Sequence, residues 1–253
     1  MMNRPLIVIP ARYGSQRLKG KMLLAETGKP LVQHTWEAAK KVAGADVLIA
    51  VDDPRIADAA QAFGAEVAMT DPDIPSGSAR VAAAAKGRDA SVIINLQGDE
   101  PEVEPSNIER LIEGHMEAAA SDRPPLISTL ACPFPTDIDA NNPNTVKVVT
   151  TTSSEAWEYA LYFSRSVMPF PRTRDHQPKL HIGLYAFSPQ PLQTFASLTP
   201  SSLAVTESLE QLSALEAGES IAVMMVERAA PGIDTADDYQ AFVSRFRAKN
   251  PNV

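Results

Sequence analysis

Apolar residues along the chain fall into two recurring patterns. Short apolar runs bounded by turn-forming residues are typical of buried strands, whereas apolar positions repeating every three or four residues are typical of amphipathic helices. Over the first 120 residues the two patterns alternate, beginning with a strand. This order favours a mostly parallel sheet covered by helices. The strands predicted for this part are 6–9, 47–51, 67–69 and 92–96.

Prolines, glycines and capping residues predict where these elements begin and end. Pro10 lacks the N–H that a sheet ladder needs, so the first strand should stop before it. Pro30 fits the first turn of a helix whose apolar positions continue toward Gly44. Asp53 and Thr235 are suited to cap the helices that follow them. The apolar face of the last helix consists of Tyr239, Phe242, Val243 and Phe246.

The middle of the chain changes character. Between residue 123 and about residue 190 it contains several prolines and the strand-like runs 126–131, 146–149 and 157–163, without a long helical pattern. We therefore expect a small antiparallel insertion at about 126–190 within a single α/β domain that spans residues 1–253. Because exposed apolar surfaces often mark association sites, this insertion is a candidate dimer interface. Beyond it, a helix over 207–215 is expected to end at Gly218, and 221–226 is predicted to be a strand.

The overall charge excludes several classes of function. The net charge of −8 argues against non-specific binding to nucleic acids or anionic membranes, since both require a basic surface. No run reaches the ~18 apolar residues of a membrane span, and the N-terminus lacks the apolar segment of a signal peptide. Cys132, the single cysteine, is expected to be a buried thiol in a reducing compartment. We therefore expect a soluble, cytoplasmic protein.

Against this acidic background, the loop after the first strand is strongly basic. It carries Arg12, Arg17, Lys19 and Lys21, and no acid appears before Glu26. In an open α/β sheet, ligands bind at the carboxyl ends of the strands, where this loop would lie. The loop would suit a polyanion such as a triphosphate, but residue types alone equally allow a solvated basic loop.

Two familiar phosphate-binding loops are excluded. A Walker loop places four residues between its glycines and a serine or threonine after its lysine. Here five residues separate Gly14 from Gly20, and Met22 follows Lys21. The chain also lacks the Gly-x-Gly-x-x-Gly fingerprint, which argues against a nicotinamide-dependent reductase. Any phosphate bound at this loop is therefore held mainly by side-chain cations.

Two acids are candidate metal ligands. Asp99 comes just after the predicted strand 92–96, near the edge where the basic loop should lie, and Mg²⁺ is commonly held by one or two carboxylates together with substrate phosphates. An acidic turn would by itself account for Asp99. An acid beside a helix start usually stabilises that helix, which would account for Asp234. Ser76 can similarly be a simple helix cap.

A series of short motifs carries a specific resemblance. In chain order they are Pro10-Ala11-Arg12-Tyr13-Gly14-Ser15, Arg17-Leu18, Gly20-Lys21, Ser76-Gly77-Ser78-Ala79-Arg80, Gln97-Gly98-Asp99-Glu100-Pro101, Asn142-Pro143-Asn144-Thr145-Val146-Lys147, Ala160-Leu161-Tyr162-Phe163-Ser164-Arg165, His181-Ile182-Gly183-Leu184-Tyr185, Glu207-Ser208-Leu209-Glu210-Gln211-Leu212 and Gly232-Ile233-Asp234-Thr235. Together they resemble the sugar-acid cytidylyltransferases, in particular those for 3-deoxy-manno-octulosonate (Kdo), over nearly the whole chain. The resemblance implies a nucleotide-diphospho-sugar transferase-like fold, with a mixed, mostly parallel sheet flanked by helices.

The resemblance also implies an activity. Enzymes of this family transfer CMP from CTP to a 2-keto-3-deoxy sugar acid and release pyrophosphate. Kdo would be the acceptor here, for lipopolysaccharide or a related cell-envelope glycan. The resemblance implies Mg²⁺ on Asp99 and Asp234, catalysis by Arg12, Lys21 and these two acids, and a homodimer. The implied CTP-binding residues are Ala11, Arg12, Gly14, Ser15, Arg17, Lys21, Ser76, Gly77, Arg80, Gln97 and Gly98. The implied sugar-acid-binding residues are Gln97, Arg165, His181, Tyr185, Glu210 and Gln211.

Some positions depart from the family pattern and leave the acceptor open. Three positions that are usually basic in the family are here Leu180, Ser188 and Ser213, an acid is replaced by Ala79, and a frequent proline is replaced by Lys19. The sugar acid could therefore be Kdo, its 8-amino analogue or an acylneuraminate. A non-catalytic CTP-binding protein of the same fold is a further alternative, against which the retained pair of aspartates argues. No side chain stands out as a general base.

Overall fold

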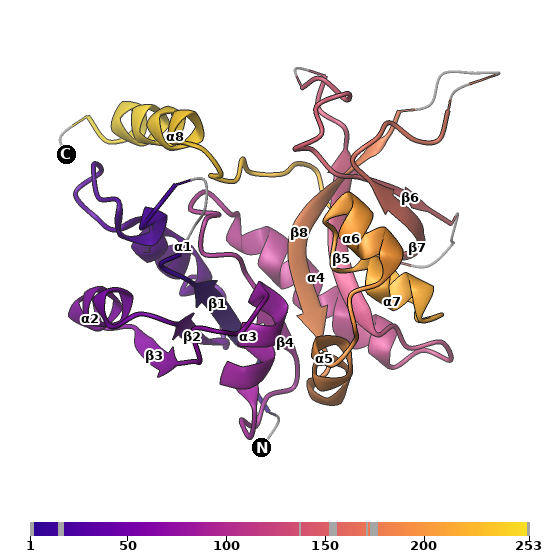
Figure 1. The fold of residues 1–253 in the computed structure, drawn as a ribbon, viewed down its shortest axis with the longest axis horizontal. Coiled ribbons are helices and arrows are strands. Elements are labelled where there is room, and N and C mark those ends of the chain that lie inside the picture. Colours follow the sequence, from indigo (N-terminus) through magenta and orange to yellow (C-terminus); the bar gives the residue numbers. More distant parts are fainter. Residues whose placement is uncertain are drawn as a thin grey trace. The chain divides into compact units, whose positions relative to one another are not determined.

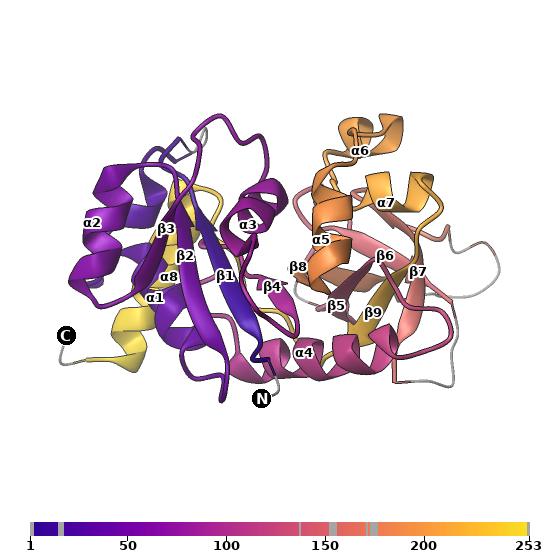
Figure 2. The same cartoon turned by 90° about the horizontal axis from the view of Figure 1, so that it is seen from below.

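The chain divides into two compact units, which we describe separately. In the computed structural model the described residues are 3–14, 18–136, 138–151, 156–170, 172 and 177–251. One unit comprises Met1–Ile108 with Ala230–Val253, and the other comprises Glu109–Ala229. Figures 1 and 2 show the elements of both units as ribbons. The boundary falls within helix α4, Pro105–Ala119.

The first unit is built on a parallel sheet with the strand order β3-β2-β1-β4. Its strands are β1 Leu6–Ala11, β2 Asp46–Val51, β3 Glu66–Met69 and β4 Ile93–Asn95. The helices are α1 Leu31–Ala39, α2 Pro54–Ala62, α3 Gly77–Ala85 and α8 Ala236–Lys249, with the short 3₁₀ helix η1 Lys21–Leu23. Figure 2 shows α2 and α3 on opposite sides of this sheet. The predicted α/β architecture is confirmed here, and β1 and β2 are apolar runs because parallel strands are buried on both faces.

The prediction that β1 stops before Pro10 is wrong. The strand continues through Pro10, which pairs with Ala50 of β2, to Ala11. Leu6 and Val8 exchange hydrogen bonds with the β4 side, since Leu6 N–H donates to Val92 and Val8 accepts from Leu96. The backbone groups of Pro10 face the β4 side of β1, as those of Leu6 and Val8 do, but β4 pairs with β1 only as far as Val8. The missing proline N–H therefore breaks no ladder hydrogen bond.

The predicted helix starts are confirmed, whereas one predicted end lies too far along the chain. The Asp53 carboxylate accepts from Arg55 N–H at the start of α2, and Thr235 forms a capping box with Asp238 at the start of α8. Helix α1 ends at Ala39, and Gly44 takes a positive φ of 74° in the turn before β2. Tyr239, Phe242 and Val243 of α8 are buried as predicted, and Phe246 is partly buried against them.

The second unit contains a mixed sheet in the order β8-β5-β9-β7-β6, with an additional pairing between β8 and β6. Its strands are β5 Ile127–Pro133, β6 Lys147–Thr150, β7 Glu158–Ser164, β8 Lys179–Phe187 and β9 Ile221–Met225, and its helices besides α4 are α5 Pro189–Ala196, α6 Ser202–Glu207 and α7 Leu212–Glu216. The predicted antiparallel segment, about 126–190, supplies β5 to β8. The parallel pairing of β5 with β9 was not predicted. Whether this segment is a dimer interface stays a prediction.

The predicted continuous helix over 207–215 is wrong. Helix α6 ends at Glu207, Ser208 adopts a left-handed conformation with φ 52°, and α7 begins at Leu212. Leu209 and Leu212 are nevertheless buried, as the apolar spacing predicted. The guanidinium of Arg165 donates to the carbonyl oxygens of Glu207 and Ser208 and so stabilises the break.

Two further features of the described residues bear on the sequence predictions. Cys132 is a free, buried thiol, as expected, and burial raises its pKa. None of the described helices is both long enough and apolar enough to span a membrane.

Buried His115 should make stability depend on pH. Its ring nitrogens contact Ser128 Oγ at 2.8 Å and Ser188 Oγ at 3.1 Å, and burial lowers its pKa to about 4. The unfolded chain has a histidine pKa of about 6.5 and binds the proton more readily, so stability is complete above that pH and falls as the pH drops toward 4. His115→Gln should remove about 1.4 kcal/mol per pH unit of that slope. Urea unfolding of the parent protein and His115→Gln at pH 7, 6 and 5 measures how the free energy of unfolding depends on pH. Equal slopes for the two proteins would show that His115 does not cause this dependence.

Candidate active site

The site residues predicted in the first unit gather at the carboxyl edge of its parallel sheet. Arg12 follows β1, and Gln97 and Asp99 come shortly after β4. Asp52, which was not predicted as a site residue, follows β2. Direct contacts join these strand ends: Tyr13 N–H donates to Asp52 Oδ1 at 2.9 Å. Gly98 lies so close to β1 that an added Cβ would be 3.1 Å from the Pro10 carbonyl oxygen and 2.9 Å from Met22 Sδ. Only glycine fits at position 98 without displacing a neighbour.

Lys21 is the point at which three predicted site residues meet. It is the first residue of η1 and only 6% exposed. Its ammonium nitrogen lies 2.5 Å from Asp99 Oδ2 and 3.8 Å from Asp234 Oδ1, and it donates to the Ile233 carbonyl at 2.7 Å. Ile233 N–H in turn donates to the Asp99 carbonyl at 2.9 Å. The ammonium charge is therefore balanced by the two acids that the resemblance assigns to the metal.

The donor set at this point fits Mg²⁺ bound together with a phosphate ligand. Within the part of the chain that the structure describes, no group of three or more histidine, cysteine, aspartate or glutamate side chains converges on one point. Asp99 and Asp234 form a two-carboxylate set, which is what Mg²⁺ uses when phosphate oxygens and water complete its shell. Desolvation, aided by the charge of Asp99, raises the pKa of Glu100 to about 8. Glu100 therefore binds a proton more readily than an ordinary glutamate, and the two-carboxylate set consists of Asp99 and Asp234.

The basic loop is closed at its ends by main-chain contacts. Gly20 N–H donates to the Tyr13 carbonyl at 3.3 Å, and Gly20 adopts φ 67°. Arg12, Gly14 and Lys19 are exposed, and Ala11 is buried at the end of β1. Two residues assigned to CTP, Ser15 and Arg17, lie outside the described residues.

The segment around α3 mixes capping and ion pairing. Ser76 caps α3, since its Oγ accepts from Ala79 N–H at 3.1 Å. Arg80 is buried and donates to Thr70 Oγ1 at 2.5 Å and to the Asp71 carbonyl at 3.2 Å. Its guanidinium also lies 3.5 Å from Asp52 Oδ2. Protein groups therefore engage Arg80, and a direct contact with CTP stays a prediction.

Asn95 is a positioning residue that sequence reasoning missed. Gln97 Nε2 donates to Asn95 Oδ1 at 2.8 Å, and Asn95 Nδ2 donates to Ser78 Oγ at 3.0 Å. Gly77 brings the start of α3 beside Gln97, because an added Cβ would lie 3.3 Å from Gln97 Oε1. Asn95 is completely buried, and a polar residue inside an apolar run is the signal that could have identified it.

The sugar-acid residues predicted in the second unit occupy β8 and the break between α6 and α7. His181 Nε2 lies 3.0 Å from Thr129 Oγ1, and the His181 and Tyr185 rings are 5.7 Å apart between centroids. Burial lowers the pKa of His181 to about 3, so its imidazole is neutral. Glu210 and Gln211 lie in the break. Gln211 is 1% exposed, and among the described residues its Nε2 has no hydrogen-bond partner.

Arg165 and the three residues that replace usually basic ones, Leu180, Ser188 and Ser213, all pack against or hydrogen-bond to other parts of the second unit. Arg165 donates to the Pro143, Glu207 and Ser208 carbonyls at 2.7, 2.6 and 3.2 Å, so it is neither a solvated cation nor shown as a sugar ligand. Leu180 is buried, Ser188 contacts His115, and Ser213 Oγ accepts from Ser201 N–H. The substitutions therefore serve packing and hydrogen bonding in this chain.

Comparison with known proteins finds a family match over most of the chain. Residues 6–221 match the family model described as cytidylyltransferase. The chain is 47% identical over 238 residues to a 3-deoxy-manno-octulosonate cytidylyltransferase of Chloroherpeton thalassium, covering 93% of this chain and 94% of the relative. It is 43% identical over 236 residues to the enzyme of that name from Escherichia coli, covering 92% of each.

Solved structures agree with the sequence relatives. The structure of a CMP:2-keto-3-deoxy-manno-octonic acid synthetase complexed with CTP superposes with a TM-score of 0.88 at 40% identity, covering 97% of this chain and 99% of that chain. The inositol-1-phosphate CTP transferase from T. maritima superposes with a TM-score of 0.61 at 14% identity, covering 98% of this chain and 97% of that chain. The second likeness concerns the fold alone.

Replacing Arg80 should expose its structural role. Arg80→Met leaves Asp52 as an uncompensated, largely buried charge, so the free energy of unfolding should fall by about 3 kcal/mol. The matched control is Arg88→Met, because Arg88 forms an exposed pair with Glu66 and its loss should cost less than about 1 kcal/mol. Urea unfolding at pH 7 compares the two. Equal, small losses would show that Arg80 is not held by a buried pair.

Proposed function

Since the chain belongs to the cytidylyltransferase family, among the 3-deoxy-manno-octulosonate cytidylyltransferases, we propose that it transfers CMP from CTP to Kdo and releases pyrophosphate. The observation that carries the proposal is the cluster of Lys21, Asp99 and Asp234 at the carboxyl edge of the parallel sheet. That edge is where open α/β sheets bind their ligands. The cluster lies next to the basic loop that suits a triphosphate.

The reaction joins the anomeric hydroxyl oxygen of Kdo to the α-phosphorus of CTP. The bond between that phosphorus and the bridging oxygen of the β-phosphate breaks, pyrophosphate leaves in line, and the hydroxyl proton is released to solvent. Catalysis then depends on positioning the reactants and on neutralising phosphate charge. Arg12 and Lys21 would supply this positive charge, together with Arg17 from outside the described residues. When bound by Asp99 and Asp234, Mg²⁺ would neutralise phosphate oxygens and lower the pKa of the attacking hydroxyl.

The sugar acid would be bound by neutral polar groups of the second unit. The Gln211 amide has a buried donor that lacks a partner among the described residues, and an unpaired buried donor is costly. An oxygen of the sugar acid would satisfy it. His181 stays neutral because it is buried, so it would orient a hydroxyl through hydrogen bonding without adding charge.

The choice among acceptors follows the relatives. The Chloroherpeton and Escherichia coli proteins are named for 3-deoxy-manno-octulosonate, and both match this chain over more than nine-tenths of its length. This favours Kdo over 8-amino-Kdo or an acylneuraminate, and an enzyme over a non-catalytic CTP-binding protein. We further propose a cytoplasmic location, which the free, buried Cys132 and the use of CTP support.

Pyrophosphate release tests the reaction. With CTP and Mg²⁺, release is expected with Kdo and not with N-acetylneuraminate, and chelation of Mg²⁺ should abolish it. Asp99→Asn should lower kcat by about 100-fold or more, since it removes one of the two carboxylates that would hold Mg²⁺ against the transferring phosphate. Asp237→Asn is the matched control, because Asp237 is exposed in the first turn of α8 and should leave kcat within about twofold. CTP binding without pyrophosphate release would favour the non-catalytic alternative.

We also propose a homodimer formed through the second unit. Leu161 of β7 and Val205 of α6 are 58% and 66% exposed, and apolar side chains of this exposure favour association. Leu161→Glu should shift the protein toward the monomer in light scattering after size exclusion. Met69→Glu is the matched control, because Met69 is also 58% exposed but belongs to the first unit. A monomeric parent protein, or equal effects of both changes, would refute this interface.

A further inference from the structure

Tyr13 connects both ends of the basic loop to the sheet. Its N–H donates to Asp52 Oδ1 at 2.9 Å, at the carboxyl end of β2. Its carbonyl accepts from Gly20 N–H at 3.3 Å. The residues beside these two contacts are Arg12 and Lys21, two of the loop cations assigned to the triphosphate. One residue therefore holds the start of the loop against its end.

The Tyr13 ring is enclosed by two neighbours. The Arg55 guanidinium carbon lies 3.5 Å from the ring centroid, which is a close cation–π contact. At the other neighbour, an added Cβ on Gly20 would lie 3.4 Å from the ring, so glycine lets the chain pass close to it. Gly20 also has φ 67°, a conformation that side chains other than glycine rarely adopt.

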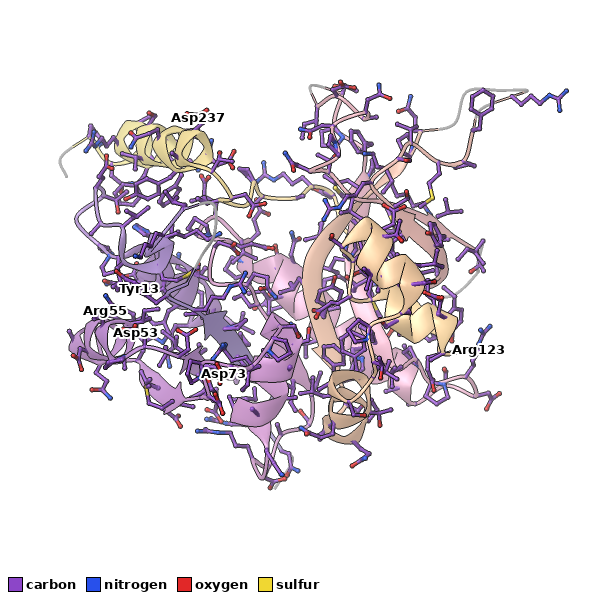
Figure 3. The ribbon with its side chains drawn as sticks, in the orientation of Figure 1. Tyr13, Asp53, Arg55, Asp73, Arg123 and Asp237 are labelled. Atoms are coloured by element: carbon purple, nitrogen blue, oxygen red, sulfur yellow. The ribbon has the colours of Figure 1, made fainter. Side chains whose placement is uncertain are left out.

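Arg55 is itself fixed in place. Its Nε and Nη2 donate to the two carboxylate oxygens of Asp53 at 2.8 and 2.6 Å, a paired geometry that lysine cannot reproduce. Asp53 is also the N-cap of α2, since Oδ1 accepts from Arg55 N–H. Figure 3 shows Tyr13, Arg55 and Asp53 gathered at this side of the first unit. The Arg55 side chain lowers the pKa of Asp53 to about 2, so the pair stays ionised at physiological pH.

We infer that Tyr13 and Arg55 form a clasp that holds the two described ends of the basic loop, residues 12–14 and 18–21, together before the nucleotide arrives. The inference rests on the proposed function, because it takes CTP as the ligand of the loop. Loop ends that are already held together in the free protein lose less conformational entropy when the cations beside them bind a phosphate. Tyr13 and Arg55 are positioning residues: they act through the loop and need not touch the phosphates.

A direct phosphate contact by Arg55 predicts a different outcome. Lysine would keep the positive charge and so preserve most of a direct contact. It would lose the close guanidinium contact with the Tyr13 ring and the paired hydrogen bonds to Asp53. The clasp therefore predicts that Arg55→Lys is nearly as harmful as Arg55→Met, whereas direct binding predicts that Arg55→Lys is close to the parent protein.

The experiment combines kinetics with hydrogen exchange in the full chain. We expect Arg55→Met and Arg55→Lys each to raise KM for CTP about fivefold, the scale of one exposed cation–π contact. KM for Kdo and kcat should stay within about twofold. In the ligand-free protein the Gly20 amide should exchange about fivefold faster, because its acceptor is the Tyr13 carbonyl.

The matched control is Arg123→Met. Arg123 also lies over a tyrosine ring, 4.7 Å from the centroid of Tyr159, but it belongs to the second unit. It should change neither KM for CTP nor exchange at Gly20. Unchanged exchange and KM in both Arg55 variants would overturn the clasp, as would a normal KM in Arg55→Lys alone. If the parent protein does not turn over CTP, the proposed function fails, whereas exchange at Gly20 still decides whether the clasp exists.

Discussion

The buried ammonium of Lys21 is the interaction on which the candidate site depends. It joins three segments that are far apart in sequence: the end of the basic loop, the turn after β4 and the segment before α8. A buried cation is tolerated only when it is paired and hydrogen-bonded. Asp99, Asp234 and the Ile233 carbonyl meet that requirement, so the charge that stabilises the fold here also gathers the two acids.

The C-terminal part of the first unit is held to this point by packing as well as by charge. Ile233 belongs to a buried cluster with Leu31 of α1 and Tyr239, Phe242 and Val243 of α8. The His34 ring of α1 packs edge-on against Phe242 and Phe246 at 5.1 and 5.0 Å between centroids. Because Asp234 directly follows Ile233, burial of this cluster limits how far the Asp234 carboxylate can move.

Much of the first unit could be predicted from the sequence because its strands and helices are marked by residues close together in the chain. Buried parallel strands appear as apolar runs, and the carboxyl ends of such strands meet at one edge, so the order of residues was enough to place Asp99 near the basic loop. The roles of Asp234 and of the second-unit residues came from family resemblance. Asp52 and Asn95 were missed because their importance lies in the partners that folding brings to them, Tyr13 N–H and Gln97. The helix predicted over 207–215 failed for a related reason, since the burial of Leu209 and Leu212 is compatible with both a continuous and a broken helix.

The charges at the sheet edge explain how an acidic chain can hold a polyanion. Lys21, Asp99 and Asp234 together carry one net negative charge, so this cluster favours a further cation. The nearby loop exposes Arg12 and Lys19, whereas Arg80 is already paired with Asp52 and Arg55 with Asp53. The loop therefore favours an anion. A ligand that brings a divalent cation and a phosphate group together neutralises both the negative cluster and the positive loop. Either ion alone leaves the charge of the other part uncompensated. This charge pattern is complementary to that of the metal-bound nucleoside triphosphate that the proposed function requires.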